Sequence, residues 1–102
     1  MKLTYARSGG VTGMVKRAVI ETEHLPTDER ATWEQLVAAA DVFALPATVS
    51  AADPRQRDAF THTLLIEDGP RRHTVEVKGT PDAPPLRALL DRLQGASTRA
   101  PQ

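Results

Sequence analysis

The apolar residues of this chain change their spacing in a fixed order, and that order constrains the fold more than any other feature. Apolar and polar residues alternate over residues 2–8 and 14–21, with glycines between the two runs. The alternation returns over residues 59–67 and 72–78, on either side of an Asp-Gly pair. Period two is typical of strands with one buried face, and a short glycine-containing interval between two such runs indicates a hairpin. The sequence therefore predicts two β-hairpins.

A helical period follows each hairpin. Apolar residues at helical spacing are Trp33, Leu36, Val37 and Ala40 in the first segment and Leu86, Leu89, Leu90 and Leu93 in the second. Thr27 is predicted to be the N-cap of the first helix, and Gly95 is predicted at the C-cap position of the second. The order is ββαββα. Because each predicted strand is apolar on one face, we expect an α+β fold with both helices packed on one face of a four-stranded antiparallel sheet.

The register of the second hairpin depends on its turn. With residues 68–71 as a four-residue loop, apolar residues face one another across the two strands. The predicted pairs are His62 with Val77, Leu64 with Val75, and Ile66 with His73. A two-residue Asp-Gly turn would keep this parity but would draw Pro70 into a strand, where it cannot donate a ladder hydrogen bond. The four-residue loop is favoured.

Composition limits the classes of function. With 102 residues the chain has room for one domain, predicted over residues 1–95, followed by a flexible C-terminal tail at 96–102. Thirteen basic residues balance thirteen acidic ones, and the isoelectric point is about 6.8, so we expect no nucleic-acid partner and no membrane partner. The N-terminal residues never form the apolar run of a signal peptide or membrane helix, which predicts a cytoplasmic protein.

The sequence offers no recognisable catalytic or metal site. It contains no cysteine, and its three histidines, His24, His62 and His73, lack the spacing of metal ligands. We interpret the two strand histidines as partly buried residues with one hydrogen bond each, and a metal or catalytic pair as the lesser alternative. No serine stands in a nucleophile-elbow motif, and the glycines of residues 9–13 precede a strand where a phosphate-binding loop precedes a helix. We predict no metal, no cofactor and no enzymatic activity.

The stretch "DVFALPATVSAADPRQRDAF", residues 41–60, is longer than a usual connection and has neither period. One interpretation is that residues 47–58 cross the sheet, so that the third strand begins at the end where the second stops and the sheet is antiparallel throughout. The turn at 68–71 would then lie beside both the 9–13 tip and Leu45-Pro46. The other interpretation is that the segment protrudes as a contact surface. Arg55 and Arg57 lie in it, and arginine is frequent at protein interfaces.

Several short motifs occur together in order along residues 2–94. They are "SGG" in the first tip, "LP" before an acidic helix start, "FALP" after that helix, "FTHTLLIEDG" followed by "RHTVEV", and "PPLRALLDRL". In this order and spacing the chain resembles the emfourin family, bacterial proteinaceous inhibitors of thermolysin-like (protealysin-like) zinc metalloproteases. The sequence departs from the family pattern at His62, where an aromatic residue is expected, and at Lys16, where an apolar one is expected. Both departures concern packing.

The resemblance implies a bacterial inhibitor that is a monomer when free and that sterically blocks the active-site cleft of a thermolysin-like zinc metalloprotease. The alternative is a non-enzymatic regulatory module with a non-protease partner. We expect partner contacts on the long connection or at the edge that holds the hairpin tips. The candidate partner-binding residues are Gly9, Gly10, Pro46, Thr48, Val49, Arg55, Arg57, Asp68 and Arg71.

Overall fold

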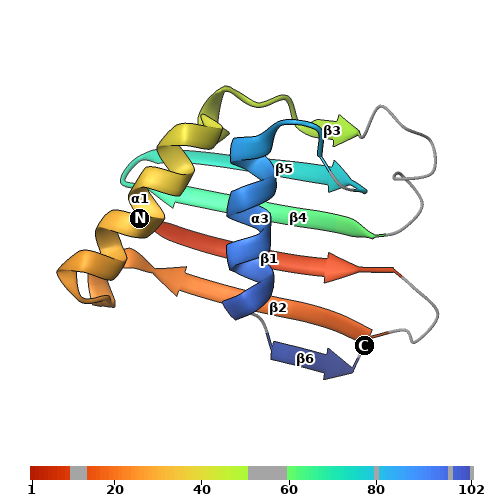
Figure 1. The fold of residues 1–102 in the computed structure, drawn as a ribbon, viewed down its shortest axis with the longest axis horizontal. Helices are drawn as coiled ribbons and strands as arrows, with labels where there is room; N and C mark the ends of the chain where they lie inside the picture. The colour runs from red at the N-terminus through yellow and green to blue at the C-terminus, as the bar shows by residue number, and fades with distance from the viewer. Residues whose placement is uncertain (10–13, 51–59, 80, 97, 102) are drawn as a thin grey trace.

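A computed structural model describes residues 1–9, 14–50, 60–79, 81–96 and 98–101 (Figure 1). Its elements follow one another in the order β1, β2, η1, α1, η2, β3, β4, β5, α3 and β6, where η1 and η2 are single 3₁₀ turns. Their bounds are β1 Lys2–Ser8, β2 Met14–Glu21, η1 Thr22–His24, α1 Thr27–Ala40, η2 Val42–Ala44, β3 Thr48–Ser50, β4 Thr61–Asp68, β5 Arg71–Lys78, α3 Pro84–Ala96 and β6 Thr98–Pro101.

The described strands form one sheet in the order β3-β5-β4-β1-β2-β6. Both helices lie on the same face of this sheet (Figure 1), so the predicted α+β fold is confirmed. The four predicted strands, β1, β2, β4 and β5, pair antiparallel with their neighbours. Two short strands that were not predicted extend the sheet: β3 pairs parallel with β5, and β6 pairs antiparallel with β2. The sheet is therefore mixed, and it is wider than the predicted four strands.

The path of the long connection differs from the prediction. Helix α1 crosses the end of the sheet at which β2 stops, and β3 then carries the chain along the outer edge to the opposite end (Figure 1). As a result β4 begins where β2 begins, and it is antiparallel because its neighbour is β1, with Thr61 opposite Ser8. The predicted start at the other end was wrong. The part of the connection at residues 51–59 lies outside the described residues.

The core lies between the sheet and the two helices. Buried apolar side chains occupy alternate positions of β1, β4 and β5, on the face that the helices cover: Leu3, Tyr5, Leu64, Ile66, Val75 and Val77. In β2, Ala18 belongs to the same cluster, whereas the buried Val15 has the opposite parity and lies outside it. Of the predicted helical positions, all four leucines of α3 are buried, as are Trp33, Val37 and Ala40 of α1. Leu36 is only partly buried and packs at the core margin. The apolar periods therefore identify the core faces correctly.

The helix ends differ from the prediction by about one turn or less. Pro26 occupies the N-cap of α1, where no side chain caps the helix, so Thr27 is the first helical residue and makes no cap. Asp41 ends α1 in the left-handed conformation, with φ 51°, and its N–H donates to the carbonyl of Ala38. Gly95 lies inside the last turn of α3, which continues to Ala96. Pro26 therefore takes the place predicted for Thr27, and α3 continues one residue beyond Gly95.

The β4–β5 hairpin has the predicted register with a shorter turn. His62 pairs with Val77, Leu64 with Val75 and Ile66 with His73, as predicted. Asp68 and Arg71 form the last pair, so the turn consists of Gly69 and Pro70 alone and the four-residue loop was wrong. A two-residue turn with positive φ at its first position matches the twist of the flanking strands, and Gly69 has φ 60°. Pro70 follows in the turn, outside the ladder.

We expect Gly69→Ala to lower the free energy of unfolding by about 1 kcal/mol, because an L-residue in the left-handed region is strained. Nothing lies within 4 Å of the position where the new Cβ would stand, so a clash would not contribute. Urea denaturation measures the loss. Gly95→Ala is the matched control: its Cβ also meets nothing within 4 Å, and it lies in a helix, where alanine is the better residue. Equal effects of the two substitutions would contradict the assigned turn.

The C-terminal residues 96–102 were predicted to form a flexible tail. The structure instead places Thr98–Pro101 in β6, paired with Met14 to Arg17 of β2. Among the described residues, no helix has the length and apolar character required to cross a membrane.

Candidate partner-binding surface

The fold divides the candidate partner-binding residues between two ends of the sheet. The loop end is the end defined by Ser8, Thr61, Lys78 and Ser50, which are paired in one row across β1, β4, β5 and β3. Gly9 follows Ser8 there. The turn end is the opposite end, where Asp68 pairs with Arg71 and Lys2 pairs with Glu67. Strand β4 has eight residues, so the two ends are separated by about 23 Å at roughly 3.3 Å per residue.

Five candidates lie at the turn end or on the β3 edge. Because the two hairpin tips are at opposite ends of the sheet, the prediction that they lie together was wrong. Asp68 and Arg71 are at the turn end, and Pro46, Thr48 and Val49 line the edge that leads away from it. Pro46 and Thr48 are exposed, whereas Val49 is half-buried and packs against the core. Gly10, Arg55 and Arg57 lie outside the described residues. The turn does lie near Leu45, as expected.

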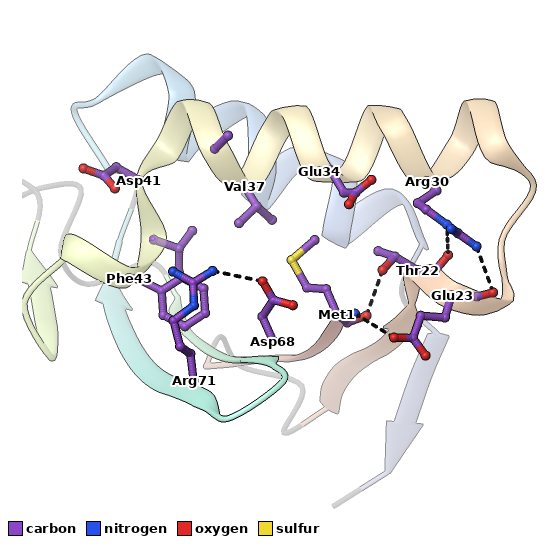
Figure 2. A pocket seen from close by; sticks show the side chains of 12 residues that line it. Met1, Thr22, Glu23, Arg30, Glu34, Val37, Asp41, Phe43, Asp68 and Arg71 are labelled. Atoms are coloured by element: carbon purple, nitrogen blue, oxygen red, sulfur yellow. Dashed lines mark hydrogen bonds and ion pairs between the residues drawn. The ribbon is translucent and has the colours of Figure 1, made fainter.

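Arg71 is held at the turn end by two contacts. Its Nη2 donates to Oδ2 of Asp68 at 3.0 Å, and its guanidinium carbon lies 4.2 Å from the centroid of the Phe43 ring (Figure 2). The Arg71 side chain nevertheless remains 62% exposed. Phe43 comes from η2, far from the turn in sequence. In the sequence pattern Phe43 only marks the end of the first helix, and the crossing path of α1 brings it to Arg71.

A second contact fixes the segment between η2 and β3. The Nε2 of His73 donates to the carbonyl oxygen of Leu45 at 2.7 Å, and the N–H of Glu76 donates to the carbonyl of Ala47 at 2.8 Å. Both donors belong to β5. These bonds attach residues 45–47 to the sheet, so that the exposed side chains of Pro46 and Thr48 have a defined place at its edge.

An open cleft of about 580 Å³ lies between α1 and the turn end. Figure 2 shows the Met1 and Val37 side chains directed into it and Asp68 at its margin. Its rim carries both charges, because Arg30 and Arg71 line it together with acidic side chains such as Glu34 and Asp68. The Arg30 side chain donates to the carbonyls of Thr22 and Glu23. An open cleft whose lining is mainly polar, with a few apolar side chains, can accept a polar or charged side chain of a partner. The sequence patterns did not predict this cleft, because its lining residues come from the N-terminus, η1, α1, η2 and the β4–β5 hairpin.

At the loop end, Arg7 joins three elements on the face that the helices cover. Its Nη1 donates to Oε1 of Gln94 in α3 at 2.7 Å, and its guanidinium carbon lies 4.2 Å from the centroid of the Phe60 ring. Phe60 is the described residue that precedes β4. Gly9, which follows β1, has φ 114°, a conformation that favours glycine. The described part of this end is therefore tied to the core.

The two strand histidines have the structural roles expected of them. His62 is 5% exposed and its Nδ1 lies 2.6 Å from the hydroxyl of Tyr5, while His73 bonds Leu45. Burial, and after it the positive charge of Arg7, lower the pKa of His62 to about 4. His62 is thus neutral near pH 7. Among the described residues, no group of three His, Cys, Asp or Glu side chains could hold a metal ion.

The fold and this surface define a small α+β protein with an exposed strand edge and an open cleft at the turn end. The Emfourin family model matches residues 5–94, a span that runs from β1 to the last turn of α3. The chain therefore belongs to the emfourin family, and the resemblance seen in its motifs is confirmed. Comparisons with curated proteins and with solved structures give no match. Membership of this family suggests a metalloprotease inhibitor role.

Proposed function

We propose that this protein inhibits a thermolysin-like zinc metalloprotease by binding the enzyme and sterically blocking its active-site cleft. The observation that carries the proposal is the family match over residues 5–94. In this proposal residues 1–95 form one inhibitory domain that has no enzymatic activity. The protein is a monomer when free and acts in the cytoplasm of a bacterium.

Steric blocking is favoured over capture of the protease's zinc ion. The chain has no cysteine, and its described residues include no group suited to hold a metal. A blocking inhibitor instead needs an exposed and well-ordered surface of about 800 Å². Exposed side chains lie at the turn end and along the edge from Pro46 to β3, where the bonds of His73 and Glu76 tie the backbone to the sheet. Such preorganisation lowers the entropy that binding costs.

The direct test follows cleavage of a peptide substrate by several thermolysin-like proteases, with the purified protein added in stoichiometric excess. Any protease encoded beside this protein belongs in the set. Inhibition that titrates to one inhibitor per enzyme would support the proposal. Undiminished cleavage by every enzyme would overturn it.

We expect Arg71→Ala to weaken inhibition by about tenfold, because exposed arginines that lie on an aromatic ring are typical interface anchors. The matched control is Arg72→Ala, since Arg72 is also exposed on β5 and has no ring contact among the described residues. Inhibition constants measured for both variants give the comparison. Equal constants for wild type and Arg71→Ala would contradict a contact through Arg71, and Arg55→Ala and Arg57→Ala in the long connection would be the next substitutions.

A further inference from the structure

The outer edge of β3 has backbone groups that no described residue pairs. Strand β3 is the last strand on its side of the sheet, and β5 is its only partner among the described strands (Figure 1). The carbonyl of Ala47 accepts from Glu76 of β5. Because peptide groups alternate along a strand, Ala47 and Val49 face β5, whereas Thr48 and Ser50 direct their N–H and C=O groups away from the sheet.

Apart from its short length of three residues, this edge lacks the features that normally prevent edge pairing. Natural edge strands are protected by charged residues, prolines or bulges. The three residues of β3, Thr48, Val49 and Ser50, include none of these, and the side chains of Thr48 and Ser50 are exposed. At the other edge of the sheet, β6 ends with Pro101, which has no N–H to donate. The β3 edge thus presents two outward donors and two outward acceptors in a row, at Thr48 and Ser50.

From this geometry we infer that the β3 edge binds an extended backbone segment of the target, which pairs with Thr48 and Ser50 as an added strand. The inference rests on the proposed function and says how the inhibitor contacts its protease. Strand addition obtains affinity from main-chain hydrogen bonds. The edge is neutral and continues into the exposed Pro46, so the target segment can extend along it toward the turn end. A second copy of this chain could pair only over the same three residues, which is far less than a stable dimer needs.

Thr48→Pro tests the inference, because proline removes the outward N–H and leaves the bonds between β3 and β5 in place. We expect the inhibition constant to rise at least about tenfold, since a donor is lost and the ring occupies the partner's position. The control Thr48→Ala keeps the N–H and should stay within about threefold of wild type. A folded Thr48→Pro variant that inhibits as strongly as the wild type would overturn the inference. If the wild type itself inhibits no thermolysin-like protease, the proposed function is overturned instead.

Amide hydrogen exchange of the wild-type chain gives an independent readout that does not require the proline variant to fold. In the free protein we expect the amides of Thr48 and Ser50 to exchange quickly and that of Val49, which faces β5, to exchange more slowly. In the protease complex Thr48 and Ser50 should become protected. Fast exchange at both positions in the complex would contradict strand addition. Strand addition would also be contradicted if the protection of these two amides rose with protein concentration in the absence of protease, because that indicates pairing between two copies of the chain.

Discussion

Leu89→Ala should lower the free energy of unfolding by about 3 kcal/mol, measured by urea denaturation at 25 °C. Leu89 is 0% exposed and belongs to the core cluster that joins α1, α3 and the sheet. Truncation to alanine removes its buried methyl groups and leaves a cavity that close-packed neighbours fill only in part. A domain of this size is stable by roughly 5–15 kcal/mol, so this single substitution removes a large fraction of the total.

The control for this experiment is Val19→Ala on β2. Val19 is 57% exposed, on the face of the sheet that the helices leave open, so its truncation should change stability by no more than about 0.5 kcal/mol. If Leu89→Ala and Val19→Ala shift the urea midpoint equally, α3 does not pack on the sheet as described.

The buried pair of Tyr5 and His62 should give the second large effect. The Tyr5 hydroxyl donates to Nδ1 of His62 at 2.6 Å in the tautomer protonated at Nε2. Burial raises the pKa of the Tyr5 phenol far above its usual value, so the hydroxyl keeps its proton. Tyr5→Phe leaves Nδ1 buried without a donor and should cost about 2 kcal/mol. The double variant Tyr5→Phe, His62→Phe removes both polar partners and should cost less than the sum of the two single variants.

His62 should also make stability fall with acidification. Its pKa is lowered to about 4 in the folded protein, first by burial and then by Arg7, against the opposite effect of Asp91. In the unfolded chain the same ring takes up a proton near pH 6.5. Between these two values the unfolded state binds more protons, so stability decreases as the pH falls from about 6.5 to about 4. His62→Phe should flatten stability over this window. A wild-type curve that is already flat there would contradict the burial of a neutral ring.

The apolar periods predicted most of the core and all of the hairpin parity. Leu86, Leu89, Leu90 and Leu93 are buried as their spacing indicates, and the β4–β5 pairs follow from facing apolar residues. These properties are local, because a period and a register are set by residues a few positions apart. The predicted turn was too long because a shorter Asp-Gly turn would have placed Pro70 in a strand, where it cannot donate a ladder hydrogen bond. Within a two-residue turn its fixed φ is tolerated.

What the sequence did not predict depends on contacts between distant segments. The path of α1 across the end of the sheet decides that Phe43 meets Arg71 and that His73 reaches the Leu45 carbonyl. It also decides which end of the sheet β4 starts from. The two added strands are too short for periodicity to reveal: β3 has three residues and β6 has four. The division of the candidate residues between two ends of the sheet therefore could not be predicted, because it depends on the path of α1.

The position of β1 in the sheet has a consequence for how the chain folds during synthesis. Strand β1 lies between β2, its neighbour in sequence, and β4, whose residues Thr61–Asp68 follow about fifty positions after β1 ends. The β1–β2 hairpin can form as soon as it leaves the ribosome, but one side of β1 stays unpaired until β4 emerges. At about 5–20 residues per second, that interval lasts several seconds. During it the nascent chain exposes an unprotected strand, so aggregation in this protein should begin from β1 in incomplete chains.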